Sequence, residues 1–287
     1  MRFCRFDNDR YGVVVGDKVH DITEAVSKVL AGKKAPRWGD PMIANLAEVR
    51  AAVGDATSFP AKALASVTLL SPTAHPSKLI AAPTNYHAHV AEMQARRPGQ
   101  PPGKGIKESG LFLKANSAMV GPGEGVHVRF LDRLTEHELE FMIVIGKEGS
   151  QISEANALDY VAGYCLSLDM TVRGPEERSI RKSIDSYAVI GPWMVTKDEI
   201  ADPNEVPFKL FVNGQIRHNA HTNDLIFNCQ KLIALASEFY TLYPGDVIFT
   251  GAPAGVGPVK PGDVMTAECA AIGPMEVKVH AYKNPQA

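Results

Sequence analysis

The sequence has no excess of charge of either sign, because 30 Lys and Arg residues stand against 32 Asp and Glu residues, for a formal net charge of -2. Such a balance provides no electrostatic field that would attract nucleic acid or an anionic membrane. The sequence also lacks the run of roughly 18 or more apolar residues that spans a bilayer. Charged side chains interrupt residues 1–7, where a secretory signal would need an apolar core. We therefore expect a cytoplasmic protein with no nucleic-acid or membrane partner.

Cysteine is also scarce. The four Cys residues are far apart in the sequence and form no CxxC pair: Cys4, Cys165, Cys229 and Cys269. This spacing argues against a zinc knuckle or a disulfide framework and predicts four reduced residues in the core. The remaining composition, 45% hydrophobic and 22% charged, is that of an ordinary globular protein with a sizeable core.

The order of helix and strand signals predicts two domains. Apolar stretches at residues 2–6 and 11–15 predict strands, and an N-cap followed by proline at residues 40–41 predicts a helix that ends at Gly54. Two prolines within residues 71–76 break both helix and sheet pairing, as is typical of a linker. We predict a small N-terminal α/β domain (residues 1–76) followed by a larger domain (residues 77–287).

The larger domain is rich in strand signals, so we predict an α+β fold that is mostly β. Residues 94–110 combine three prolines and several glycines with scattered charges, which predicts a long mobile loop. The predicted strands cover residues 140–146, 161–172, 208–212, 247–250 and 277–281, and the clearest helix covers residues 225–240.

Two carboxylates flank Leu139 at the start of the first of these strands. Strand alternation sends Glu138 and Glu140 to the same face, where two anions repel each other. Such a pair is tolerated either at a solvated strand end or beside a divalent cation. A third carboxylate, Asp169, interrupts another strand, where a charge is costly unless it is paired or binds a metal. Three carboxylates without cysteine suit Mg²⁺, or alternatively Mn²⁺ or Ca²⁺, better than zinc.

A candidate base precedes these strands. If the segment around it is helical, His89 and Glu92 share a face at spacing i and i+3, so the carboxylate could orient the imidazole. The alternatives are an incidental pair on a surface helix, or a weak H-x-H metal motif formed by His87 and His89. Lys182 lies in a cationic segment and would by itself be taken for a solvated side chain. The Gly-rich residues 250–257 lack the spacing of a P-loop or of a dinucleotide fold.

Taken in order, these segments resemble the fumarylacetoacetate hydrolase family, in its acylpyruvase-like branch, over residues 78–280. Each fragment is weak alone, and the ordered set is specific. The matching segments are Lys78-Leu79-Ile80, Asn85-Tyr86-x-x-His89, Phe112-Leu113-Lys114, residues 120–123, Glu138-x-Glu140 with the strand after it, Gly163-Tyr164 to Asp169, Lys182-Ser183-x-Asp185, Gly191-Pro192-Trp193, residues 244–248 and residues 250–257.

The resemblance implies a mixed β-roll catalytic domain, commonly dimeric, that holds a divalent metal. It implies that Glu138, Glu140 and Asp169 are the metal ligands and that His89 and Glu92 form the dyad that activates water. Lys182 matches the family's active-site lysine. Tyr86 and Thr250 match residues that contact the substrate, and the proline-rich segment after the dyad resembles a lid.

Some positions depart from the family pattern, and all of them leave the metal ligands intact. They concern recognition of the outer end of the substrate. They are Leu168 in place of Asn, Val172-Arg173-Gly174 in place of Ala-Arg-Asp, Glu176 and His218 each in place of Gln, and Ala252 in place of Thr.

The resulting hypothesis is a metal-dependent hydrolase that cleaves a carbon–carbon bond in a 1,3-diketo or acylpyruvate-type acid, as in the breakdown of aromatic compounds. Arg173 would hold a carboxylate of this oxo-acid substrate, because its planar fork matches a carboxylate. The alternative is a lyase or isomerase, such as a decarboxylase, hydratase or keto-enol isomerase, that uses the same metal site. A noncatalytic binding protein is the third hypothesis.

Overall fold

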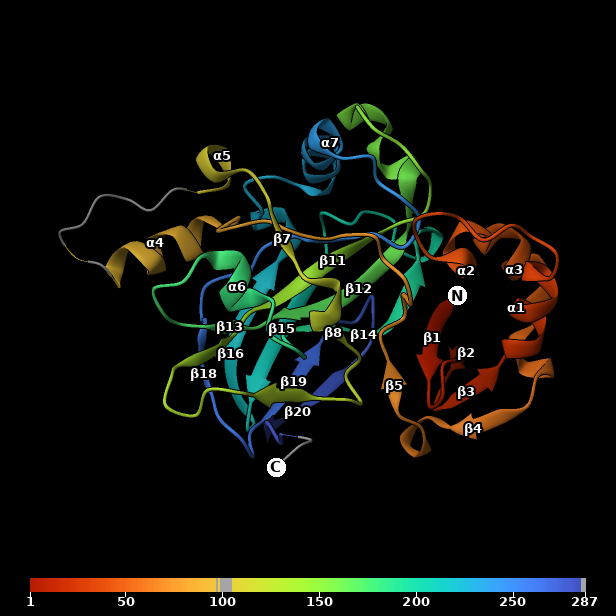
Figure 1. The fold of residues 1–287 in the computed structure, drawn as a ribbon, viewed down its shortest axis with the longest axis horizontal. Helices are drawn as coiled ribbons and strands as arrows, with labels where there is room; N and C mark the ends of the chain where they lie inside the picture. Colours follow the sequence, from red (N-terminus) through yellow and green to blue (C-terminus); the bar gives the residue numbers. More distant parts are fainter. Residues whose placement is uncertain (97, 99–104, 285–287) are drawn as a thin grey trace.

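The structure is a computed structural model that describes residues 1–96, 98 and 105–284. Its largest feature is a 12-stranded sheet that joins strands of the N-terminal part of the chain to strands from the rest of the chain (Figure 1). Strand β5 (Leu69–Leu70) pairs with β1, and β8 (Met119–Val120) pairs with β14. The other strands follow the order β4 (Ala61–Ala63), β3 (Lys18–Asp21), β2 (Arg10–Val15), β1 (Arg2–Phe6), β14 (Ala188–Thr196), β12 (Val161–Asp169), β11 (Leu139–Ile145), β17 (Val247–Phe249), β6 (Leu79–Ala81) and β7 (Phe112–Lys114).

The centre of this sheet consists of β11, β12 and β14, whose residues are all buried. Continuous apolar runs such as residues 141–145 suit these positions, because both faces of the strands are covered. The two hydrophobic cores lie on the two faces, since Phe141 and Ile143 belong to one core and Met142 and Val144 to the other.

Two smaller sheets complete the β structure. One has the order β13 (Thr171–Val172), β10 (Thr135–His137) and β18 (Gly257–Val259). The other has the order β16 (Gln215–His221), β15 (Pro207–Val212), β19 (Val264–Glu268), β20 (Met275–Ala281) and β9 (Val126–Val128). The fold is therefore α+β and mostly β, as the sequence predicts.

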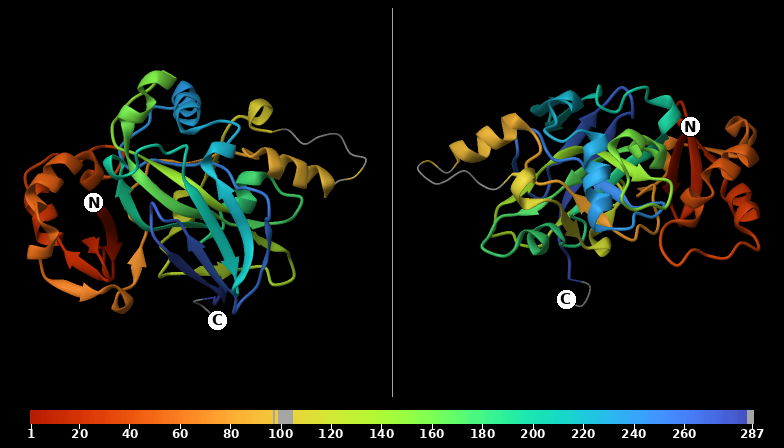
Figure 2. Two further views of the ribbon diagram at one scale, coloured as in Figure 1. Left: turned by 180° about the vertical axis from the view of Figure 1, so that it is seen from behind. Right: turned by 90° about the horizontal axis from the view of Figure 1, so that it is seen from above.

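The N-terminal residues form a lobe in which helices cover the strands β1 to β4 (Figure 2). This lobe is joined to the rest of the chain through its own strand, because Arg2 pairs with Val195 and Phe3 with Met194 across β1 and β14. The domain boundary near residue 76 stays a prediction.

The predicted helix over residues 40–54 is wrong as one continuous element. It consists of α2 (Pro41–Ala44) and α3 (Leu46–Val53), which follow α1 (Thr23–Leu30). Asp40 caps α2 as expected by accepting from the Met42 and Ile43 amides. The chain then breaks at Asn45, whose side-chain amide donates to the Pro41 carbonyl at 2.8 Å, because Asn competes with the helical backbone for hydrogen bonds.

The predicted helix over residues 225–240 begins later than expected, as α7 (Cys229–Phe239). The Asn228 side chain accepts from the Lys231 amide and so defines the start of the helix. The predicted strand over residues 161–172 also divides, since β12 ends at Asp169 and β13 lies in a different sheet.

The predicted loop over residues 94–110 is wrong at both ends. Helix α4 (His87–Ala95) extends into it, and residues 106–109 form α5 (Ile106–Ser109). The Glu108 carboxylate accepts from the Gly105 amide at 3.0 Å and thereby caps α5. Residues 97 and 99–104 of this prediction lie outside the described residues. Both helices lie on the side of the molecule away from the N-terminal lobe (Figure 1). Among the described residues, no helix has the length and apolar character needed to cross a membrane.

Candidate active site

The acidic residues lie where the neighbouring strands β11 and β12 of the large sheet connect to β10 and β13 of a smaller sheet. The chain passes from β10 to β11 at Glu138, and from β12 to β13 directly after Asp169. Leu139 pairs with Leu168 across β11 and β12, and the Asp169 amide donates to the Glu138 carbonyl at 2.8 Å. The antiparallel register therefore places Asp169 opposite Glu138, although 31 positions separate them in the sequence.

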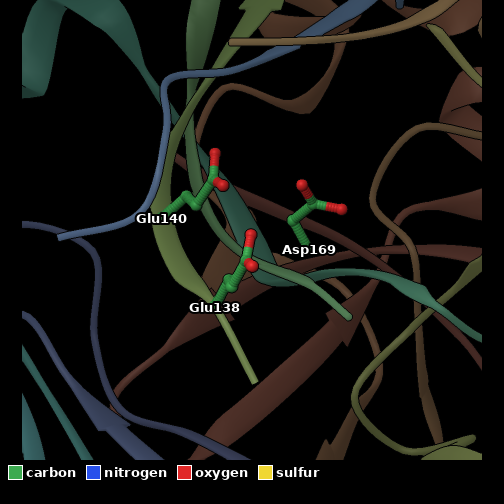
Figure 3. A group of neighbouring side chains, drawn as sticks. All are labelled: Glu138, Glu140 and Asp169. Atoms are coloured by element: carbon green, nitrogen blue, oxygen red, sulfur yellow. The ribbon is translucent and has the colours of Figure 1, made fainter. Parts of the chain in front are cut away.

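Three carboxylates converge where these strands connect the two sheets (Figure 3). One carboxylate oxygen from each of Glu138, Glu140 and Asp169 lies within 4.8 Å of the others. All three side chains are buried, with exposed fractions of 7%, 1% and 1%. The alternation along β11 and the isolated acid at the end of β12 thus produce the geometry expected from the sequence. The roles of these residues as metal ligands stay a prediction.

Two buried ammonium groups balance part of this negative charge. The Lys182 Nζ donates to Glu138 at 2.6 Å and to Asp169 at 2.7 Å. The Lys114 Nζ pairs with Asp169 and donates to the Tyr187 carbonyl at 2.9 Å. Burial opposes the charged form of Lys182, but the carboxylates of Asp169 and Glu138 outweigh it and raise the pKa of Lys182. Lys182 therefore stays an ammonium ion inside the site.

The two glutamates differ in their electrostatic environment. Burial alone would raise the pKa of Glu138, but the charges of Lys182 and Arg173 lower it to about 2. Glu140 accepts the Gly251 amide at 2.6 Å and has no ion pair among the described residues. Burial and the charges of Asp169 and Glu138 raise the pKa of Glu140 well above its usual range. The cluster is therefore short of positive charge at Glu140.

This imbalance fits a bound divalent cation. A buried carboxylate beside two others is stable as an anion only when a cation removes the repulsion. Carboxylate oxygens are ligands for hard cations such as Mg²⁺, Mn²⁺ and Ca²⁺. Glu138, Glu140 and Asp169 would hold such an ion.

The predicted dyad is formed within α4. The His89 Nδ1 donates to Glu92 Oε2 at 3.0 Å, since a carboxylate can only accept. His89 is 6% exposed, and its Nε2 is then left as the basic nitrogen. Burial alone would raise the pKa of Glu92, but the His89 hydrogen bond and the charge of Arg96 lower it. The Gly255 amide also lies 3.3 Å from each carboxylate oxygen of Glu92, so the Gly-rich turn supports the orienting group.

His89 of the dyad and the carboxylates of Glu138 and Asp169 line one cavity of about 570 Å³. Helices α4 and α5 and helix α6 (Arg178–Lys182) contribute to its wall. Among the residues that line it are His89, Glu138, Asp169 and Lys182. His89, two of the three clustered carboxylates and the Lys182 ammonium group therefore line the same cavity.

The three predicted substrate contacts differ in their positions. Arg173 lines the cavity and pairs with Glu136 and with Glu138. Tyr86 is 1% exposed, and its buried hydroxyl has no hydrogen-bond partner among the described residues. The Thr250 hydroxyl is buried and donates to the Phe141 carbonyl at 2.7 Å. Neither Tyr86 nor Thr250 lines the cavity in this structure, and the substrate contacts of all three stay predictions.

Three further charged residues belong to the site and have no role in the sequence analysis. Lys114 is an ion-pair partner of Asp169, although it lies 55 positions before it. Glu136 is buried between Arg96, at 3.0 Å, and Arg173. The sequence could have indicated that Glu136 lies near the site, because it lies two residues before Glu138 in a strand. No local pattern distinguishes Lys114 or Arg96 from solvated cations.

Comparison with known proteins gives consistent results. Residues 78–280 match the family described as fumarylacetoacetate (FAA) hydrolase C-terminal. Maleylpyruvate hydrolase of Aquipseudomonas alcaligenes is 51% identical over 98% of this chain and 100% of its own length. The mitochondrial oxaloacetate tautomerase Fahd2a of Rattus norvegicus is 35% identical over 78% of this chain and 73% of its own length. The structure of maleylpyruvate hydrolase from Sphingobium sp. SYK-6 in complex with manganese (II) ion and pyruvate is 37% identical, covers 99% of this chain and 100% of its own, and superposes with a TM-score of 0.81.

The first prediction concerns the ligand role of Glu140. Glu140→Gln should lower the affinity for Mn²⁺ by roughly 100-fold or more, because the change removes a ligand charge where outer partners alone contribute 10- to 100-fold. Calorimetric titration measures the affinity, and the rise in melting temperature on adding Mn²⁺ is a second measure. The control Glu92→Gln should keep the wild-type affinity. Unchanged Mn²⁺ binding by Glu140→Gln would refute the assignment.

Proposed function

Since the chain belongs to the fumarylacetoacetate hydrolase family, we propose that it is a metal-dependent hydrolase of a carbon–carbon bond in an acylpyruvate-type 1,3-diketo acid, such as maleylpyruvate. Such acids arise in the breakdown of aromatic compounds. The observation that carries the proposal is the shared cavity, which is lined by His89, held by Glu92, and by Glu138 and Asp169 of the carboxylate cluster. The 51% identity to a maleylpyruvate hydrolase supports it.

Glu138, Glu140 and Asp169 would hold the cation, with Mg²⁺ as the proposed ion and Mn²⁺ or Ca²⁺ as alternatives. When bound, a divalent cation supplies Lewis-acid chemistry, in that it polarises a carbonyl and stabilises negative charge on the departing fragment. The manganese complex of the Sphingobium relative is consistent with this part of the proposal.

His89 would act as the general base. Its Nε2 accepts a proton from a water molecule while the water oxygen attacks the carbonyl carbon distal to the 2-oxo acid end. The Nδ1–H bond to Glu92 fixes the ring, and the negative charge of Glu92 stabilises the imidazolium that forms. The carbon–carbon bond then breaks, and its electron pair leaves with the pyruvate fragment as an enolate, which is protonated to complete the reaction.

Lys182 and Arg173 would stabilise negative charge on the substrate. The ammonium of Lys182 lies between Glu138 and Asp169 and faces the cavity, so it can stabilise the negative charge that develops on the substrate. Arg173 lies beside Glu138 on the same wall. It would therefore bind the carboxylate at the 2-oxo acid end of the substrate.

The second candidate function is a keto-enol isomerase or decarboxylase that uses the same metal site. The observation in its favour is the 35% identity to an oxaloacetate tautomerase. Neither reaction needs water as a nucleophile: decarboxylation breaks the bond to the leaving carbon dioxide, and isomerisation needs a base only to remove a carbon-bound proton. A product assay with acylpyruvates and oxaloacetate in the presence of Mg²⁺ or Mn²⁺ separates the two functions.

The second prediction concerns the dyad. His89→Ala should lower turnover of an acylpyruvate by roughly 10²- to 10⁴-fold, the usual contribution of general base catalysis. Glu92→Gln should act in the same direction, because it removes the charge that favours the imidazolium. Steady-state kinetics with saturating Mn²⁺ measures the effect, and Mn²⁺ affinity should stay at the wild-type value.

A different pattern would contradict the hydrolase proposal. If both dyad variants keep near wild-type turnover while Lys182→Ala abolishes it, the isomerase or decarboxylase reaction becomes the better description. The control is Arg50→Ala, which removes an exposed ion pair with Asp198 and should leave turnover unchanged.

The third prediction is that the protein is a homodimer in the cytoplasm. Leu131 and Ile180 are 68% and 63% exposed, and the segments that carry them flank a second hollow lined by Phe130 and Ile184. Exposed apolar groups of this kind favour association with another surface. Light scattering of the full chain should give about twice its mass of 31.0 kDa. The mass of one chain at micromolar concentration would refute the dimer.

A further inference from the structure

The cavity wall formed by α6 carries more positive charge than the proposed chemistry uses. Arg178, Arg181 and Lys182 all line the cavity from this short helix. Arg178 and Lys182 are four residues apart and so lie on one face, about one helical turn from each other. Lys182 is occupied by the carboxylate cluster. The two arginines therefore lie beside the reaction site rather than within it.

Arg173 and the two helix arginines differ in their partners. Arg173 already pairs with the carboxylates of Glu136 and Glu138. Neither Arg178 nor Arg181 has an ion pair with a carboxylate in the part of the chain that the structure describes. A guanidinium that lines a cavity without a counter-charge can bind an anion from solution.

Neutral groups hold both arginines in place. The Arg181 Nε donates to the Glu176 carbonyl at 2.7 Å. The guanidinium of Arg178 lies over the Phe112 ring, 5.3 Å from its centroid, which leaves the N–H groups at its edge available. Burial and repulsion from Arg173 and Arg178 lower the pKa of Arg181. The two arginines are three residues apart on α6 and line the same cavity, so an anion between them would relieve their repulsion.

We propose that Arg178 and Arg181 bind a second carboxylate at the outer end of the substrate, so that the enzyme selects dicarboxylic oxo acids over monocarboxylic ones. This inference rests on the proposed function, in which the 2-oxo acid end lies at the carboxylate cluster. A substrate that reaches from this cluster along α6 presents its outer end to the two guanidinium groups. Among the other described charges on the wall, Lys107 of α5 adds to the positive potential, and Glu108 caps its own helix.

Two matched ligands test the second carboxylate without turnover. 2-Oxoadipate and 2-oxohexanoate have the same carbon chain and the same 2-oxo acid end, but only the first has a carboxylate at its outer end. Calorimetric titration of the Mn²⁺-loaded protein should show that 2-oxoadipate binds roughly 10- to 100-fold more tightly, the range for charge-assisted hydrogen bonds.

Variants assign this preference to the arginines. Arg178→Gln and Arg181→Gln should each remove most of the preference for 2-oxoadipate while the affinity for 2-oxohexanoate stays unchanged. Arg181→Lys should retain part of it, because the charge remains. The matched control is Arg129→Gln, whose guanidinium pairs with Asp185 away from this cavity, and it should keep the full preference.

The possible failures are distinguishable. A wild-type protein that binds both acids equally overturns the second-carboxylate site and leaves the proposed hydrolysis standing. The assignment to Arg178 and Arg181 is overturned if the preference survives in both glutamine variants. It is also overturned if the variants lose affinity for both acids equally. A wild-type protein that binds neither acid overturns this inference and the proposed function together.

Discussion

The pairing of buried carboxylates with buried cations, at the point where two strands change sheets, is the constraint on which the site depends. An ionised carboxylate in the interior costs several kcal/mol unless other groups compensate its charge. Lys182 and Lys114 compensate Glu138 and Asp169, whereas the Glu140 carboxylate has, among the described residues, a backbone amide as its partner and no cation. The fold therefore holds an incomplete charge balance that a divalent cation would complete, and the positions of the three acids follow from one register between β11 and β12.

The other charged and basic groups of the site lie around the three carboxylates. The His89–Glu92 pair is carried on α4, where Glu92 is held by the Gly-rich turn as well as by His89. Different elements thus supply the charged groups: the strands carry the carboxylates, α4 carries His89, and α6 presents cations. The strands are fully buried and fix the carboxylates, whereas both helices contribute to the cavity wall.

Sequence reasoning succeeded where the relevant spacing is local. The alternation of Glu138 and Glu140 and the i, i+3 spacing of His89 and Glu92 depend only on the element that carries them. It failed where a contact depends on the whole fold: Lys114 meets Asp169 through pairing of distant strands, and no pattern around it indicates burial. The break at Asn45 and the helical ends of residues 94–110 were missed because single hydrogen bonds of polar side chains decide them. The motif resemblance indicated the cluster as a whole, but not the partners of Arg173.

The fate of the water oxygen distinguishes hydrolysis from decarboxylation and from tautomerisation. The Mn²⁺-loaded protein is given maleylpyruvate in water labelled with ¹⁸O, and the products are analysed by mass spectrometry. We expect cleavage to pyruvate and a second acid, with one ¹⁸O atom in the new carboxylate of that second acid and a loss of this product in His89→Ala. Release of carbon dioxide, or conversion of the substrate to a tautomer without cleavage of the chain, would contradict it.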